Sequence, residues 1–244
     1  MTEPAPRKSD LGVRVLSAVV MIAVAGTALW LGGWFWTAFV VAVATVCLSE
    51  FIRLIWLATA SSWKRLTGSA AAFAYVGWAG LALAYMRHRL TDDVGGWMGF
   101  MSVLAVLGIV IFTDIGAYFS GRAIGGPKIA TKISPSKTWA GLFGGMAAAS
   151  LWSVLALQLW VVVTDYESGI GRHQLPEVPI AVPLIGAMLA VLAQVGDFFQ
   201  SWLKRRAGVK DSSNLIPGHG GIFDRVDGLI PVVLVASCLT VPPF

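Results

Sequence analysis

Three aspartates lie at or just beyond the end of an apolar stretch, where a charged side chain is costly to place. Asp197 ends one such stretch, and Asp224 and Asp227 follow it, three residues apart. Residues with that spacing share one face of a helical turn, and a charge beside a membrane span is by default a functional-site hypothesis. Carboxylates are ligands that Mg²⁺ prefers, usually one or two for each ion. We therefore predict that Asp197, Asp224 and Asp227 bind Mg²⁺.

A fourth aspartate, Asp114, interrupts the apolar residues 111–118. A carboxylate inside an apolar segment is expensive, so Asp114 is a further candidate for a functional role. A structural interpretation stays open for both Asp114 and Asp197. Either carboxylate could pair with a neighbouring Lys or Arg and so close a bundle of helices.

Cationic and glycine-rich residues surround the three aspartates of the C-terminal half. A triphosphate held through a metal needs both signs of charge nearby, since cations neutralise the charge on phosphoryl groups. The glycines in residues 216–221 let the backbone approach a ligand closely. His219 is predicted to bind phosphate or to transfer a proton, and a structural hydrogen bond is an equal alternative. The candidates in this segment are Ser201, Lys204, Arg205, Lys210, Asp211, His219, Gly220, Gly221 and Arg225.

A second polar segment, residues 125–139, precedes another apolar stretch and is expected to form a loop. It places Ser134, Lys137 and Thr138 just before a predicted helix. The N-terminus of a helix has unpaired N–H groups and the positive end of the helix dipole, which together bind anions. This makes the segment a candidate phosphate site. On this segment alone the ordinary alternative is stronger, because Ser136 or Thr138 is a good N-cap residue.

The composition indicates that these side chains belong to an integral membrane protein. The chain has 244 residues, of which 57% are hydrophobic and 13% charged, whereas soluble domains have about 45–50% apolar and about 25% charged residues. The apolar segments are close to the roughly 20 residues that a helix needs to cross a bilayer. We predict an all-α polytopic membrane protein with about seven transmembrane helices and a polar, cytoplasm-facing active-site cavity. The predicted spans are residues 11–31, 34–57, 66–86, 97–119, 139–164, 180–199 and 229–241.

The basic residues give these spans an orientation. With a cytoplasmic N-terminus, only Arg87, Arg89 and Arg172 of the 18 Lys and Arg residues fall outside the cytoplasmic segments, as the positive-inside rule expects. The net charge of +5 therefore follows from topology and does not indicate a nucleic-acid partner. Cys47 and Cys238 lie in apolar segments, which favours small buried hydrophobes over a disulfide or a metal pair.

We expect a single domain in three parts, located in the inner membrane. Residues 1–10 form a cytoplasmic tail, residues 11–119 form the N-terminal transmembrane helices, and residues 120–244 form a catalytic region. The two polar segments, after the fourth and the sixth span, then lie on the same cytoplasmic side. A soluble nucleotide would be available to both.

The string from Ser201 to Asp227 resembles the signature of the phosphatidate cytidylyltransferase (CDP-diacylglycerol synthase) family. It contains S-x-x-K-R, four residues, K-D, then I-P-G-H-G-G, two residues and D-R-x-D. Residues 134–138 resemble the second motif of that family, and residues 114–118 resemble its D-x-G-A-Y element. The sequence departs from the family pattern where Ala140 and Gln200 replace commonly acidic residues, and where Ser213 and Asn214 replace a more usual glycine-containing pair.

The resemblance implies an Mg²⁺-dependent transfer of a nucleotidyl group from CTP to phosphatidic acid. It implies that Asp197, Asp224 and Asp227 bind the metal, with a place for K⁺ or another second cation beside it. It also implies a homodimer surrounded by membrane lipids. The phosphates would be held by Lys204, Arg205, Lys210 and Arg225, and the nucleotide would contact Ser134, Lys137 and Thr138.

Two other hypotheses stay open at this stage. The same chemistry could act on a different lipid phosphate, such as a phosphorylated isoprenoid ether lipid, since any apolar span could accept its chains. The chain could also be a transporter or a lipid-binding protein without turnover. A transporter would be expected to show inverted repeats and broken helices near the membrane midplane, and no such repeat is visible in the sequence.

Overall fold

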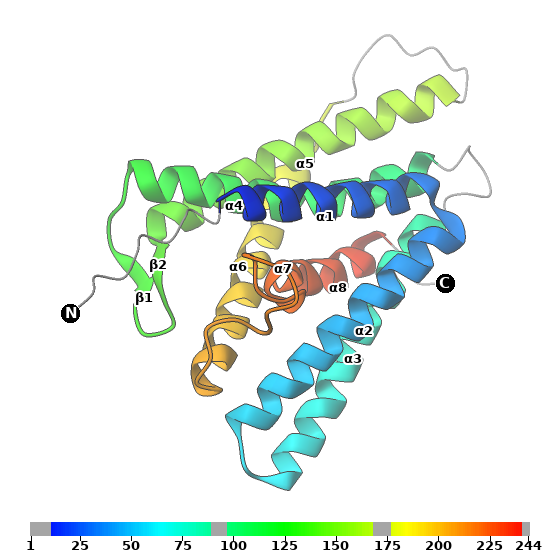
Figure 1. The fold of residues 1–244 in the computed structure, drawn as a ribbon. Helices are drawn as coiled ribbons and strands as arrows, with labels where there is room; N and C mark the ends of the chain where they lie inside the picture. Colours follow the sequence, from blue (N-terminus) through cyan, green and yellow to red (C-terminus); the bar gives the residue numbers. More distant parts are fainter. Residues whose placement is uncertain (1–10, 89–96, 168–176, 241–244) are drawn as a thin grey trace.

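The chain folds as a helical bundle with one short β-hairpin (Figure 1). The computed structural model describes residues 11–88, 97–167 and 177–240, so the predicted tail of residues 1–10 lies outside the described residues. Within these ranges, six helices are long and apolar enough to cross a membrane. They are α1 Leu11–Leu31, α2 Gly33–Ala58, α3 Ser62–His88, α4 Trp97–Ala123, α5 Trp139–Glu167 and α6 Ala181–Arg206.

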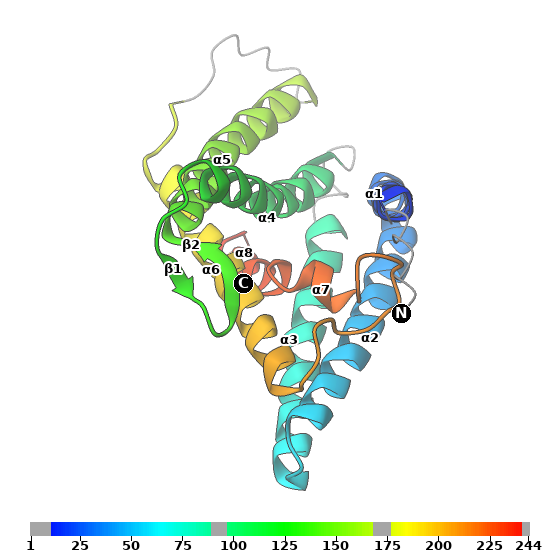
Figure 2. The same ribbon diagram turned by 60° about the vertical axis from the view of Figure 1, so that its left-hand side comes forward.

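Two shorter helices follow α6. They are α7, Phe223–Val226, and α8, Leu229–Thr240. The 12 residues of α8 span only about 18 Å at a rise of 1.5 Å for each residue, which is well short of the roughly 30 Å of hydrocarbon in a bilayer. The described residues therefore provide six helices of spanning length, one fewer than predicted. Figure 2 shows α7 and α8 between α6 and the hairpin formed by α2 and α3.

The long helices expose apolar side chains on their outer surfaces. Leu16, Trp34 and Leu151 are each more than 60% exposed, and contiguous apolar surface of this kind is rare on a soluble monomer. The buried core between the helices combines large side chains such as Phe223 and Leu54 with small ones such as Ala149. The chain is a multi-pass membrane protein whose outer faces suit hydrocarbon.

Small residues bring α4 and α5 into close contact along their length. A Cβ atom built on Gly116 would lie 2.4 Å from the carbonyl oxygen of Gly144, and one on Gly144 would lie 1.9 Å from Ser120 Oγ. Small residues at such spacings let transmembrane helices approach closely. This contact positions Asp114 on α4 beside the segment that enters α5.

The polar segment before α5 forms a hairpin where the sequence predicted a loop. Strand β1, Lys128–Ala130, pairs antiparallel with β2, Ser134–Thr138, and Ala130 lies opposite Ser134. The β-branched Ile129 favours an extended conformation, and the proline within β2 is tolerated because the strand is an edge strand. The hairpin places Lys137 and Thr138 at its end, immediately before the first residue of α5.

Candidate active site

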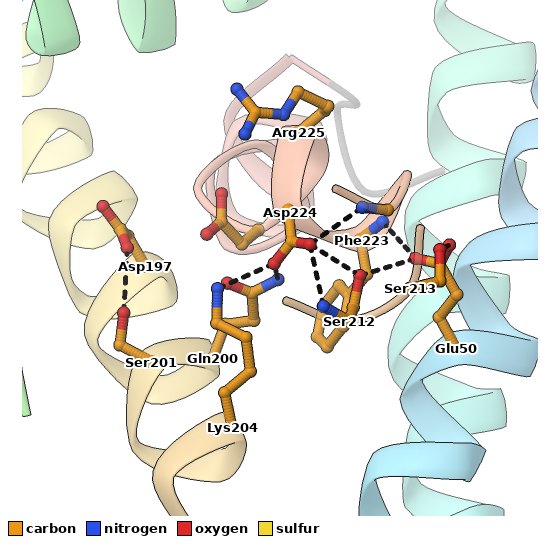
Figure 3. Close-up of polar contacts among 12 residues, drawn as sticks. Glu50, Asp197, Gln200, Ser201, Lys204, Ser212, Ser213, Phe223, Asp224 and Arg225 are labelled. Carbon is orange, nitrogen blue, oxygen red and sulfur yellow. Dashed lines mark hydrogen bonds and ion pairs between the residues drawn. The ribbon is translucent and has the colours of Figure 1, made fainter. Parts of the chain in front are cut away.

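Asp224 is the most heavily hydrogen-bonded carboxylate in the described part of the chain. One oxygen, Oδ1, accepts bonds from Gln200 Nε2 at 2.9 Å and Lys204 Nζ at 2.7 Å. The other, Oδ2, accepts from the N–H and the hydroxyl of Ser212 and from the N–H of Gly221, at 2.8 to 2.9 Å. Figure 3 shows these donors reaching Asp224 from α6 on one side and from the loop on the other. Burial alone would raise the pKa of Asp224, but the bonds from Lys204, Gly221 and Ser212 outweigh burial and hold it below its usual value.

The ion pair of Lys204 with Asp224 ties the loop to the end of α6. The two side chains are 15% and 4% exposed, so both charges are largely removed from water. Such a pair is stable only when its remaining hydrogen-bonding groups are satisfied, and the further donors on Asp224 meet that condition. The sequence predicted Lys204 as a phosphate ligand, whereas in the structure its ammonium group is bound to Asp224.

A second buried carboxylate, Glu50 on α2, holds the other side of the same loop. It is 5% exposed and accepts hydrogen bonds from the main-chain N–H groups of Ile222 and Phe223 and from the hydroxyls of Ser212 and Ser213. The Ser212 hydroxyl lies 2.9 Å from both Glu50 and Asp224, so the two carboxylates share its single proton. Figure 3 shows Glu50 entering from α2 opposite α6. The two carboxylates thus fix the loop from opposite sides.

The sequence analysis did not select Glu50, although a signal for it was present. Glu50 is an acidic residue inside the second apolar segment, and a charge in such a segment marks a functional-site candidate. Its neighbour Arg53, one turn further on, donates to the carbonyl oxygen of Ser212 at 2.9 Å. Glu50 and Arg53 of α2 therefore both bind the loop, across 159 to 173 positions of sequence.

Asp197 joins the two polar segments of the sequence. Its Oδ2 lies 2.5 Å from Lys137 Nζ, which comes from the hairpin, and the two side chains are 35% and 18% exposed. Ser201 Oγ donates to its Oδ1 at 3.4 Å, a long bond within α6. The Lys137 ammonium also lies 4.6 Å from the ring centroid of Phe198. This partly open ion pair is the point where the hairpin meets α6.

Asp227 lies close to Asp197 and is more deeply enclosed. Burial, followed by the charge of Asp197, raises the pKa of Asp227 to about 7. Its Oδ1 accepts a bond from the N–H of Gly228 at 2.9 Å. The main chain at Asp227 packs on α6, where a Cβ atom on Gly196 would lie only 2.3 Å from the Asp227 carbonyl oxygen. The absence of a side chain at Gly196 thus allows Asp227 to sit beside Asp197.

Asp114 belongs to the same electrostatic group. The charges of Asp197, Lys137 and Arg225 all act on its carboxylate. Acidic side chains from α4, α6 and the turn after α7 therefore act on one another, and Lys137 from the hairpin pairs with Asp197 among them.

The binding of one metal ion by Asp197, Asp224 and Asp227 stays a prediction. In residues 11–88, 97–167 and 177–240, no three His, Cys, Asp or Glu side chains are arranged to hold a metal ion. Asp224 accepts four hydrogen bonds and also lies within bonding distance of the Ser212 hydroxyl, so protein donors fill the roughly four lone-pair positions of its carboxylate. Asp197 and Asp227 are the pair whose chemistry fits a cation. Their negative charges are close to each other, and one or two carboxylates are the usual protein contribution to an Mg²⁺ site.

The glycines of the loop make room for the two carboxylates that fix it. Gly220 has φ of +82°, and a Cβ atom on it would lie 2.7 Å from Asp224 Oδ2. A Cβ atom on Gly221 would lie 2.1 Å from Ser212 Oγ and 2.4 Å from Glu50. The structure therefore gives Gly220 and Gly221, predicted as substrate ligands, a role in close packing.

The structural alternative raised for His219 is present. Its Nδ1 lies 2.8 Å from the hydroxyl of Ser17 on α1, and its main-chain N–H donates to the carbonyl oxygen of Ile216. Arg225 Nη2 donates to the carbonyl oxygen of His219 at 2.9 Å. The loop is thus also attached to α1.

The remaining candidates divide between the hairpin and the surface. The Thr138 hydroxyl accepts a bond from the N–H of Gly141 at 3.1 Å, which confirms the N-cap interpretation for α5. Ser134 lies in the ladder opposite Ala130. The side chains of Arg205, Lys210, Asp211 and Arg225 are exposed around the ion pairs.

Known proteins match most of this chain. The model of the cytidylyltransferase family matches residues 54–241. A phosphatidate cytidylyltransferase of Brucella suis biovar 1 (strain 1330) is 32% identical over 263 residues, covering 91% of this chain and 90% of that protein. The chain belongs to the phosphatidate cytidylyltransferase family. Proteins of that name from Pseudomonas aeruginosa, at 36% identity over 91% of this chain and 74% of theirs, and from Rickettsia bellii, at 30% over 92% and 88%, are similar as well.

Two departures from the family pattern have local explanations. Ser213 places its hydroxyl on the Glu50 carboxylate, so its side chain adds a bond to the loop. Gln200 is fully buried and donates to Asp224, while its Oε1 has no hydrogen-bond partner within the described residues. Both side chains help to hold the loop that carries Asp224, and among the described residues neither is hydrogen-bonded to the ion pair of Asp197. The segment with the phosphatidate cytidylyltransferase signature therefore forms one structural unit together with α2.

Proposed function

We propose that this chain is a CTP:phosphatidate cytidylyltransferase that forms CDP-diacylglycerol and releases pyrophosphate. The names of two relatives, of which 90% and 74% of the length is covered, support this assignment. The observation that carries it is the ion pair of Lys137 with Asp197, because it joins the two polar segments beside the partly buried Asp227. A cation and two carboxylates in one place are suited to a metal-bound triphosphate.

The reaction needs positioning more than acid–base catalysis. An oxygen of the lipid phosphate forms a bond to the α-phosphorus of CTP, and the bond from that phosphorus to the bridging β-oxygen breaks. The lipid phosphate is already an anion at neutral pH, so no dedicated base is required. Pyrophosphate leaves with the electron pair of the broken bond. Holding the reactants in line and neutralising charge supply most of the rate in such transfers.

Asp197 and Asp227 are the residues that would hold Mg²⁺. When bound, the ion would neutralise the charge of the phosphates and orient them. Asp224 supports the loop in this proposal and is not assigned to the metal, because its oxygens are occupied by protein donors. A second, monovalent cation and a homodimer stay predictions from the family resemblance.

The cationic side chains around Asp197 and Asp227 would bind different phosphates of CTP. Lys137 would exchange its contact with Asp197 for a phosphate oxygen, which keeps its charge compensated. Arg205 in the last turn of α6, and Lys210 and Arg225 in the segment after it, are exposed and would bind the outer phosphates of CTP. Arginine suits this role because its planar group donates two parallel hydrogen bonds to a phosphate.

We further propose that the site faces the cytoplasm from the inner membrane. With a cytoplasmic N-terminus, six spans return the chain to the cytoplasmic side at the end of α6. The short α8 leaves that assignment unchanged, because the loop containing Lys210 precedes it. The hairpin before α5 then also lies on the cytoplasmic side, beside the same loop.

The test is a reaction in detergent micelles with purified protein, CTP, phosphatidic acid and Mg²⁺. The expected products are CDP-diacylglycerol, measured by mass spectrometry, and one equivalent of pyrophosphate. Asp197→Asn should lower the rate by about 10²–10³-fold, the order found when a charge-stabilising group is removed. Asp165→Asn, near the far end of α5, is the matched control and should keep full activity. An unchanged rate in Asp197→Asn, or no product with any divalent metal, would contradict the proposal.

A further inference from the structure

A long apolar groove opens on the side of the bundle where α2, α3, α6 and α8 meet. Its volume is about 880 Å³, within the roughly 300–1,000 Å³ of sites that hold small organic ligands. Its walls are mostly aliphatic and aromatic, with Phe51 and Tyr75 on one side and Phe199 on the other. The groove is therefore suited to a hydrocarbon ligand.

The groove lies on the opposite face of α6 from the proposed reaction site. Its lining residues on α6 include Val195, Phe199 and Arg206, which recur at helical spacing along one face. Asp197 and Lys204 are displaced from that face by about half a turn of the helix, at 3.6 residues for each turn.

Phe51 forms a partition between the groove and the loop of the reaction site. Its ring stacks on Phe223 at 4.7 Å between centroids and meets Phe199 edge-on at 5.9 Å. Phe223 directly precedes Asp224 and is itself buried. Phe51 and Phe223 therefore separate a ligand in the groove from the loop that carries Asp224, whereas Gly196, on which the Asp227 main chain packs, lines the groove.

Two cations stand at one end of this apolar groove. Lys64, near the start of α3, and Arg206, the last residue of α6, are its only charged lining residues. Both side chains are exposed, and neither forms an ion pair within the residues that the structure describes. The guanidinium of Arg206 lies 5.5 Å from the ring centroid of Trp202, which also lines the groove. Tryptophan and basic side chains together are typical of the membrane–water interface.

The dimensions of the groove match one leaflet of a bilayer. Its lining on α3 runs from Lys64 to Tyr75, and its lining on α6 runs from Arg206 back to Val195. Each run covers roughly 17 Å at 1.5 Å for each residue, which is about half of the roughly 30 Å hydrocarbon thickness. The cationic end then lies at the depth of the lipid phosphates, and the other end lies near the midplane.

We infer that this groove binds one anionic phospholipid, separately from the substrate. An acyl chain lies along Phe199 and Tyr75, and the lipid phosphate lies between Lys64 and Arg206. The two cations at the open end of the groove favour an anionic headgroup. The apolar walls of the groove favour a lipid over a free phosphate ion.

The experiment counts retained lipid by native mass spectrometry of the full chain in detergent, with phosphatidylglycerol as the probe. Ala71 is an exposed residue in the wall of the groove, and the adjacent Ala70 is exposed outside it. Ala71→Trp should reduce the fraction of protein carrying one phosphatidylglycerol at least tenfold, while Ala70→Trp should leave it unchanged. Equal retention by the two variants would overturn the inference. Loss of a dimer peak in Ala71→Trp would also overturn it, because a second copy of the chain would then cover the groove.

A pair of surface substitutions tests the charge at the open end of the groove. Lys64→Gln with Arg206→Gln should weaken phosphatidylglycerol retention about tenfold and bring it to the level of zwitterionic phosphatidylcholine. Lys128→Gln with Lys132→Gln removes the same charge from the hairpin and should have no effect. Wild-type protein that retains both lipids equally would contradict the inference. Because bound mass is the readout, the result does not depend on turnover of CTP.

Discussion

The main-chain N–H of Phe223 donates to the carboxylate of Glu50 at 2.7 Å, across 173 positions of sequence. The same carboxylate accepts the N–H of Ile222 and two serine hydroxyls. Asp224, the next residue after Phe223, is held from the other side by Gln200 and Lys204 of α6. The loop with the family signature is therefore suspended between α2 and α6. Its shape depends on a helix that the signature does not include.

Removing the Glu50 carboxylate should loosen this loop. In Glu50→Ala, the hydroxyl of Ser213 and the N–H groups of Ile222 and Phe223 lose their acceptor, while the Ser212 hydroxyl keeps Asp224. Each buried donor left unsatisfied costs about 1–3 kcal/mol. We expect the thermal midpoint to fall, hydrogen exchange across residues 211–222 to accelerate, and turnover to drop at least tenfold. Hydrogen–deuterium exchange with mass spectrometry and a rate assay measure these effects.

The control for Glu50 is its neighbour on α2. The hydroxyl of Ser49 donates to the carbonyl oxygen of Val46 in the same helix. Ser49→Ala should therefore change neither hydrogen exchange nor turnover. Glu50→Asp keeps the charge on a shorter side chain and should recover part of the activity. Slow exchange of residues 211–222 in Glu50→Ala would show that the loop does not depend on Glu50.

The ion pair of Lys137 with Asp197 should behave as one functional unit. Lys137→Met removes a cation that we assign to the phosphates, so the rate should fall by about 10²-fold. The double variant with Asp197→Asn should be no slower than the slower single variant. When two groups act as a unit, removing either one already removes their joint contribution to the rate. Steady-state kinetics of the two single variants and the double variant measure this coupling.

Lys132, an exposed residue at the turn of the hairpin, supplies the control for this cycle. Lys132→Met removes the same charge from the same hairpin and should keep the wild-type rate. Rates that multiply in the double variant would show that Lys137 and Asp197 act independently.

Local sequence patterns predicted the helices well because hydropathy and charge are local properties. The apolar residues 11–31 and 97–119 were both expected to form helices, and α1 and α4 contain them. The last predicted span became the short α8, since an apolar segment can be buried against other helices without crossing a bilayer. The hairpin at Lys128–Thr138 was missed because a loop and a short hairpin share the same composition.

The site could be predicted only as a set of residue types. Sequence motifs identified Asp197 and Lys137 separately, but which cation meets which carboxylate depends on how distant helices pack. Lys204 was assigned to phosphate and is paired with Asp224, an outcome that spacing alone could not decide. Glu50 lies outside every motif, so only the folded chain connects it with the loop.

Gly221 should tolerate no side chain. A Cβ atom there would lie 2.1 Å from Ser212 Oγ and within 2.6 Å of both Glu50 carboxylate oxygens, so either the loop or α2 would have to move. Overpacking of this kind typically costs about 1–3 kcal/mol. Gly221→Ala should lower the thermal midpoint and the rate together. Gly77→Ala, within α3 where nothing lies within 4 Å, is the control and should be neutral or stabilising, since alanine favours a helix. Wild-type stability in Gly221→Ala would refute the close packing of the loop.

Asp227 should make both stability and metal binding depend on pH. Burial and the charge of Asp197 raise its pKa from 3.8 to about 7, so the folded chain binds an extra proton between these values and loses stability as pH rises through 7. Without divalent metal, Asp227→Asn should therefore melt a few degrees higher than wild type at pH 8 and at the same temperature below pH 4. Because a metal ligand must be deprotonated, Mg²⁺ should stabilise wild type more at pH 8 than at pH 6 and should not stabilise Asp227→Asn. Differential scanning fluorimetry measures all of these midpoints, with Asp165→Asn as the control for lost charge. A wild-type Mg²⁺ response that is equal at pH 6 and pH 8 would remove Asp227 from the metal site.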